Sequence, residues 1–183
     1  MADVLMHYVV SYLLLRRVFS WRISLIIALV ALLPDIDVFF RIHRWFTHSI
    51  IVLGISSLCL TILFTLFKKY RRYLLYLSSA ILIYLLHLVV DLFTASTPIL
   101  WPLITESYSL RIFVQGYVAK DRTISIYPVL MVSTSSSNFT PRDSLEGPLA
   151  TDLSIVIALA ILALELVEFR TKVAKNKNEF ALS

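Results

Sequence analysis

Residues 73–93, YLLYLSSAILIYLLHLVVDLF, form an apolar run with only two ionisable side chains near its end, His87 and Asp91. A helix rises about 1.5 Å per residue, so a run of this length crosses the hydrocarbon core of a bilayer, which is about 30 Å thick. Of the 183 residues, 58% are hydrophobic and 16% are charged, whereas a soluble domain is about half apolar and a quarter charged. The composition therefore predicts a membrane protein and excludes a disordered chain.

Four further apolar segments lie on either side of this run. Residues 47–67 contain no Lys, Arg, Asp or Glu, and residues 152–169 are almost as apolar, while residues 21–33 and 4–15 are shorter. We therefore expect an all-α membrane protein with about five transmembrane helices in a bundle. A cleaved signal peptide is the alternative for the first segment. Its start is acidic and a basic pair follows it, which is the reverse of the charge order in signal peptides.

Eleven of the 17 basic residues form three clusters at the ends of these segments. The clusters are Arg16, Arg17 and Arg22; Lys68, Lys69, Arg71 and Arg72; and Arg170, Lys172, Lys175 and Lys177. The positive-inside rule places all three in the cytoplasm. This predicts a multi-pass protein of the cell (plasma or inner) membrane with its N-terminus outside and its C-terminus in the cytoplasm. Anionic lipids suffice as partners for the clusters, so we expect membrane lipids and no nucleic acid.

The polar stretch between the last two apolar segments has a pattern of its own. Residues 108–118 and 123–132 are rich in β-branched and aromatic side chains, and a short charged turn separates them. This pattern predicts a β-hairpin, in which Pro128 favours an edge strand. The expected domains are a helical membrane core with the metal site (1–103), an extracytoplasmic β-rich lid or loop (104–150), and the last helix with its basic tail (151–183).

All four histidines lie at a predicted outer membrane edge or in an outer loop. Asp91 follows His87 by four residues, which places both on one helix face. An Asp in a membrane costs about 2.5 kcal/mol or more at a helix centre, and several carboxylates at one depth repel each other unless a cation joins them. The sequence therefore predicts a metal site with the candidate ligands His7, Asp35, Asp37, His48, His87 and Asp91.

The ligand types narrow the choice of metal. Imidazole nitrogen with carboxylate oxygen suits divalent zinc, and also manganese, iron or nickel. Cys59 is the only cysteine, so a thiolate site is excluded. We expect zinc first, and one or two ions, because the candidate ligands outnumber those of one tetrahedral ion.

Each candidate also has a simpler interpretation. Asp35 and Asp37 follow Pro34 and are typical turn residues. His48 could cap the next helix, and His43 could contact lipid headgroups. The pair of His87 and Asp91 on an apolar helix has no comparable structural explanation, apart from pairing with each other.

Several short motifs occur together in a fixed order. They are Leu33-Pro34-Asp35-Ile36-Asp37, then His43-Arg44-Trp45-Phe46-Thr47-His48-Ser49, then His87-x-x-x-Asp91-x-x-Thr94, then Trp101-Pro102. Over roughly residues 3–103 the chain resembles the YdjM/DUF457 family, which is described as inner-membrane, metal-dependent hydrolases. The resemblance implies a helical membrane bundle with a metal site built from His7, Asp35, His48, His87 and Asp91, and with Asp37 as a ligand or base.

The expected function is metal-assisted hydrolysis of a lipid or another amphiphilic phosphoester or ester at the outer membrane interface. Asp37 or His43 would transfer a proton, and Arg44 would bind an anionic group such as phosphate. Two alternatives stay open: a transporter for a metal ion or proton, and a scaffold whose metal staples the helices. A transport path is poorly supported, because Glu165 and Glu168 are almost the only ionisable groups in the inner halves of the segments.

Overall fold

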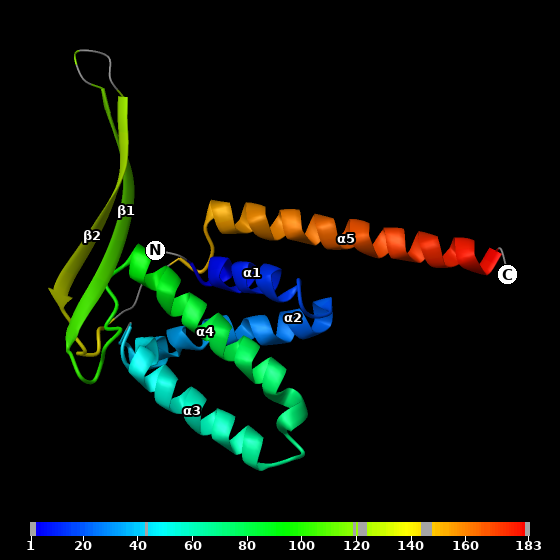
Figure 1. Ribbon diagram of the computed structural model, residues 1–183, viewed down its shortest axis with the longest axis horizontal. Coiled ribbons are helices and arrows are strands. Elements are labelled where there is room, and N and C mark those ends of the chain that lie inside the picture. Colours follow the sequence, from blue (N-terminus) through cyan, green and yellow to red (C-terminus); the bar gives the residue numbers. More distant parts are fainter. Residues whose placement is uncertain (1–2, 43, 119, 121–123, 144–147, 182–183) are drawn as a thin grey trace.

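The computed structural model describes residues 3–181 except 43, 119, 121–123 and 144–147, and describes side chains as far as Thr171. In chain order the elements are α1 (Val4–Leu15), α2 (Trp21–Ala28), η1 (Leu29–Leu32), η2 (Pro34–Phe40), η3 (Phe46–His48), α3 (Ile50–Leu66), η4 (Arg71–Tyr73), α4 (Leu74–Thr94), β1 (Glu106–Val118), β2 (Ile124–Ser136) and α5 (Asp152–Ala181). The helices lie beside one another, and the two strands project from one end of them as an arm (Figure 1).

The expected bundle of about five membrane-spanning helices is wrong. Within the described residues, one continuous helix, Arg71–Thr94, is long and apolar enough to cross a bilayer. A second span is obtained only if the bent pair Trp21–Leu32 and Pro34–Phe40 counts as one. The segments α1 and α3 are apolar, but they have 12 and 17 residues. Hydropathy detects apolar composition and not where a helix ends, which is why the sequence suggested more spans.

Helix α2 is short because the chain changes to a 3₁₀ helix and then bends. After Ala28 it continues as the 3₁₀ helix η1, and it bends by 49° before η2 begins at Pro34. Proline has no N–H to continue the helical hydrogen-bond ladder, so it suits the first position of a new helix. This bend delivers the start of η2, with its two aspartates, to the end of the helices where α4 finishes (Figure 1).

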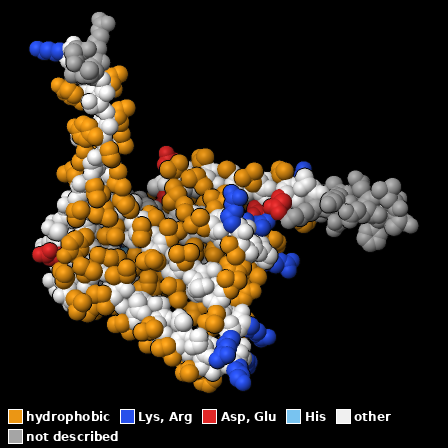
Figure 2. Space-filling model, in the orientation of Figure 1, with side chains coloured by type: hydrophobic (Ala, Val, Ile, Leu, Met, Phe, Trp, Pro, Cys, Tyr) orange, Lys and Arg blue, Asp and Glu red, His pale blue; other side chains and the backbone are white. Residues whose placement is uncertain are grey.

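The hydrophobic core lies between α1, α2 and α4. It consists of Tyr12, Leu15, Phe19, Ile27, Ala28, Ala31 and Ile83. Ala28 and Ala31 are completely buried, which lets the chain of α2 and η1 approach its neighbours closely. Helix α3 buries none of its residues. The described surface is therefore largely apolar over the helices, as Figure 2 shows, and suits a lipid environment.

Helix α5 is attached to both ends of α1. At one end the Asp3 carboxylate caps α1 by accepting from the Met6 N–H, and it also accepts from the backbone N–H and the hydroxyl of Thr151. At the other end the Arg16 Nε donates to Glu165 over 2.6 Å. These contacts fix the position of α5 along α1 although α5 contributes little to the core.

The predicted β-hairpin is confirmed, and it is longer than the sequence indicated. Its strands pair antiparallel with Glu106 opposite Ser136 and Val118 opposite Ile124. Pro128 lies opposite Val114 inside β2. A proline is tolerated there because each strand of a two-stranded sheet has a free edge on which a missing N–H breaks no pairing.

Candidate metal centre

Four separate elements bring histidine and aspartate side chains to one end of the helices. The residues are His7 on α1, Asp35 and Asp37 on η2, His48 on η3, and His87 and Asp91 on α4. All except Asp35 are at most 5% exposed. Each lies in the part of the chain between residues 3 and 103, and together they form the cluster that we call the His/Asp centre.

Two hydrogen bonds hold the short helices η2 and η3 in place beside α4. The hydroxyl of Thr47 donates to the backbone carbonyl of Pro34 over 2.5 Å, which ties η3 to the start of η2. The Tyr84 hydroxyl on α4 donates to the Thr47 carbonyl over 2.6 Å. The aspartates of η2 and the histidine of η3 are thereby held against α4.

Asp35, His48 and His87 form a triad whose ligand atoms all lie within 4.8 Å of one another, and Asp91 lies beside both of its imidazoles. The Nε2 atom of His48 lies 3.4 Å from Asp91 Oδ2 and 3.7 Å from Asp35 Oδ1. The Nε2 atom of His87 lies 3.8 Å from each of the same two oxygens. Ligands at about 2.1 Å from a tetrahedral zinc ion are about 3.4 Å apart, so these separations are close to those of a zinc site.

His7 borders this group from α1. Its Nε2 atom lies 3.4 Å from Asp91 Oδ1, whereas His48 and His87 lie near the other oxygen, Oδ2. Its ring stacks on the ring of His87 with centroids 3.9 Å apart. His7, His87 and Asp91 form a second triad whose ligand atoms lie within 4.8 Å of one another. The Asp91 carboxylate thus faces two candidate ligand groups.

Asp37 lies behind His48. Its Oδ2 atom is 3.2 Å from His48 Nδ1 and accepts the backbone N–H of Trp45 over 2.6 Å. The side chain is fully buried. A carboxylate that binds the second ring nitrogen of a ligand histidine fixes its tautomer and orientation. The structure therefore places Asp37 next to a candidate ligand rather than in either candidate triad.

Arg44 and His43 are the two other residues expected to act in catalysis. Arg44, with a left-handed backbone φ of 60°, donates from Nε to Asp91 Oδ2 over 2.7 Å and is 9% exposed. No local pattern predicts this ion pair, because the partners are 47 positions apart. His43 lies outside the described residues.

The donor set fits a divalent cation. Three carboxylates are enclosed here, and burial lowers the pKa of His48 while its contacts with Asp37 and Asp91 more than offset this and raise it above the ordinary value. Among the described residues, the buried His87 Nε2 atom has no hydrogen-bond partner. A buried polar atom of this kind is explained by a ligand such as a metal ion.

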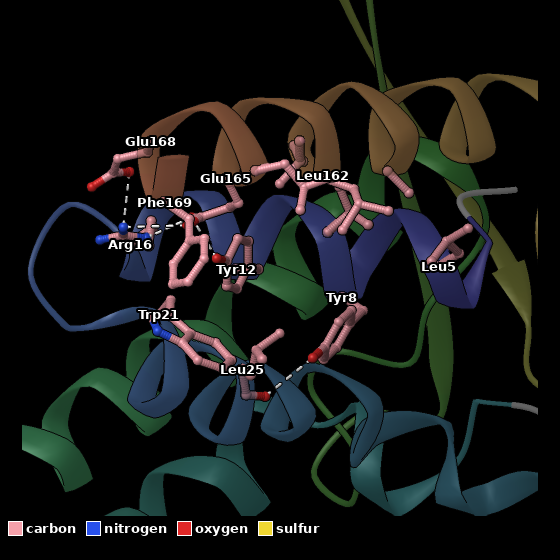
Figure 3. Close-up of a pocket in the computed structure, with 14 residues that line it drawn as sticks. Leu5, Tyr8, Tyr12, Arg16, Trp21, Leu25, Leu162, Glu165, Glu168 and Phe169 are labelled. Atoms are coloured by element: carbon pink, nitrogen blue, oxygen red, sulfur yellow. Dashed lines mark hydrogen bonds and ion pairs between the residues drawn. The ribbon is translucent and has the colours of Figure 1, made fainter. Parts of the chain in front are cut away.

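A cavity in the described part of the chain is separate from the centre. It measures about 510 Å³ and lies between α1, α2 and α5. Tyr8, Tyr12 and Arg16 line it from α1 (Figure 3), whereas His7 points from the opposite side of that helix. Burial, together with the adjacent Glu165, raises the pKa of Tyr12 to about 12, so its hydroxyl stays protonated as a donor to Glu165.

A long apolar helix that ends in a buried group of histidines and aspartates defines a membrane protein with a candidate metal centre. Comparison with known families identifies it more closely. The chain matches the family described as YdjM inner membrane protein over residues 4–170, and it therefore belongs to that family, as its motifs indicated. No curated protein and no solved structure matches it significantly.

Proposed function

We propose that this protein is a metal-dependent hydrolase of the inner membrane, acting on the ester or phosphoester of a lipid or another amphiphile. One observation carries the proposal: imidazole and carboxylate atoms from η2, η3 and α4 converge at 3.4–3.8 Å. Asp35, His48 and His87 would hold the ion, and His7, His87 and Asp91 would form a second position. When bound, a divalent cation acts as a Lewis acid and lowers the pKa of water toward about 7.

The exposure of the residues suggests how a substrate would approach. The Asp35 side chain is 20% exposed, while those of His48, His87 and Asp91 are at most 2% exposed. A substrate would therefore enter from the η2 side. Asp37 is fully buried, which favours an orienting role over direct proton exchange with solvent.

Arg44 would bind the anionic part of the substrate. Its Nε–H is used by Asp91, and a guanidinium has further N–H donors that suit phosphate. This anchored position places a fixed positive charge beside the candidate ligands. An anionic ester, such as a phospholipid or a polyprenyl-phosphate-like molecule, is therefore favoured over a neutral one.

The distribution of charge supports an orientation in the membrane. Lys68, Lys69, Arg71 and Arg72 flank the start of α4, and the His/Asp centre lies at its end. By the positive-inside rule the start of α4 faces the cytoplasm and the centre faces outward. We propose further that the N-terminus lies outside and the basic C-terminus lies in the cytoplasm.

Replacing His87 by Ala tests the proposal. We expect the purified variant to lose bound metal in elemental analysis, and to lose hydrolysis in a screen of lipid phosphoesters and esters with and without chelator. Ser79→Ala is the matched control, since the Ser79 hydroxyl on the same helix bonds only the Leu75 carbonyl. Stoichiometric metal in the His87 variant would show that the ligand assignment is wrong.

The same preparations separate the alternative functions. Metal that is bound tightly without hydrolysis of any ester would favour a scaffold whose ion staples α1, η2, η3 and α4. Metal or proton flux into proteoliposomes, abolished by His87→Ala, would favour a transporter.

A further inference from the structure

The register of the β-hairpin sorts its side chains onto two chemically different faces. Successive residues of a strand point to opposite sides, and paired residues share a side. One side, which we call the aliphatic face, carries Leu110, Ile112, Val114, Val118, Ile124, Ile126, Pro128, Leu130 and Val132. The other, the mixed face, carries Arg111, Phe113, Gln115, Tyr117, Ser125, Tyr127, Val129, Met131 and Ser133.

The aliphatic face is exposed although it carries no polar side chain over this length. Val114, Val118, Ile124 and Ile126 are between 66% and 72% exposed. A two-stranded hairpin is at best marginally stable in water, and a continuous exposed apolar surface marks an interaction site. The hairpin, with 13 residues in each strand, needs an apolar surface against which to pack.

The position of the hairpin indicates that the apolar surface it packs against is the membrane. The arm leaves the molecule beside the end of α4, and it runs crosswise to α5 and obliquely to α4 (Figure 1). Because α4 is the helix that can cross the bilayer, an arm that begins beside the end of α4 begins at the membrane surface. Hydrophobic side chains cover the visible length of the arm (Figure 2), and the charged Lys120 lies at its tip.

The charges of the hairpin fit a lipid surface. Arg111 lies on the mixed face, so the aliphatic face can enter the boundary between headgroups and acyl chains without burying a charge. Lys120 at the tip can reach lipid phosphates while its stem stays in the apolar layer. A segment with one apolar face and one polar face is suited to lie in the interface of a bilayer.

We propose that the β-hairpin is a membrane-surface arm, whose aliphatic face lies in the outer boundary between headgroups and acyl chains and whose mixed face contacts water. The arm anchors the end of the protein that carries the His/Asp centre at a fixed depth. This proposal rests on the membrane location of the family and on the fold, and it holds whether or not the centre hydrolyses an ester.

Two neighbouring positions on β2 provide a matched test. Ile126 is on the aliphatic face and Tyr127 is on the mixed face, and both are exposed, so a cysteine at either position should leave the fold intact. Each is introduced into the full chain with Cys59→Ser, which removes the exposed native thiol. The cysteine is labelled with an environment-sensitive fluorophore, and the protein is reconstituted into vesicles of phosphatidylethanolamine and phosphatidylglycerol.

We expect a nitroxide lipid labelled near the glycerol backbone to quench the probe at position 126 several-fold more strongly than the probe at position 127. Equal quenching, or stronger quenching at 127, would overturn the proposal. The protein-to-lipid ratio is then lowered to test the other occupant, a second copy of the chain. Quenching at 126 that rises on dilution would show that another copy had covered the face, and this outcome would also overturn the proposal.

Discussion

Asp37 illustrates how much of the candidate centre depends on residues that do not point into it. It holds His48 by Nδ1 and is itself fixed by the Trp45 backbone N–H. We expect Asp37→Asn to leave the fold unchanged and to weaken metal binding by about 10- to 100-fold, because an amide fixes the imidazole tautomer less firmly. Metal titration of the purified protein checks this. An unchanged metal affinity would show that Asp37 does not support a ligand.

Arg44 balances the charge of Asp91 in a site that is almost closed to water. Side-chain exposures are 9% for Arg44 and 2% for Asp91. Removing one partner of a buried pair leaves the other charge uncompensated and costs about 3–5 kcal/mol. We therefore expect Arg44→Ala to unfold at a lower temperature in detergent, and added divalent metal to restore more stability to it than to the wild type. Equal stabilisation of both proteins by metal would contradict a shared role at Asp91.

At the scale of elements, the junction of α1 and α5 depends on one carboxylate. Burial raises the pKa of Asp3, but hydrogen bonds from Thr151, Met6 and Ser154 together outweigh it and hold the pKa below the ordinary value. A lowered pKa contributes stability that is complete above the ordinary pKa and is lost as the pH falls through the lowered one. The junction should therefore weaken in acid, below about pH 4.

Amide hydrogen exchange can follow this junction at one position. The Leu5 N–H donates to the Leu149 carbonyl, so it should exchange faster, relative to its intrinsic rate, once Asp3 is protonated. Asp3→Asn keeps a capping side chain and should remove the acid dependence. Protection of Leu5 that declines equally in both proteins would show that another group controls the junction.

An element or contact could be predicted from the sequence where its signal is local in the chain. The hairpin was predictable because strand alternation and a turn are local features, and His87 with Asp91 because four residues make one helical turn. The apolar segment 21–33 ends at the bend before Pro34, but the change from α2 to the 3₁₀ helix η1 after Ala28 could not be predicted, since the composition stays apolar across that change. The stacking of His7 on His87 joins residues 80 positions apart, and nothing local reports such a contact.

For the whole molecule, the main asymmetry is between a basic end and a His/Asp end. Figure 2 shows lysine and arginine side chains gathered around the helix ends farthest from the base of the arm. With Cys59→Ser as background, Glu106→Cys at the base of the arm should react with a membrane-impermeant thiol reagent from outside the inner membrane. Lys69→Cys in the basic turn should react only after that membrane is opened. The reverse pattern would overturn the proposed orientation.

Helix α1 borders both the His/Asp centre and the cavity between α1, α2 and α5. One side of it presents His7 to the candidate ligands, and the other side lines the cavity with Tyr8, Tyr12 and Arg16. A small rotation of this single helix would alter both spaces at once. A ligand that binds in the cavity and rotates α1 must then change the affinity of the centre for a cation. Binding of the cation must change the affinity of the cavity for that ligand by the same factor.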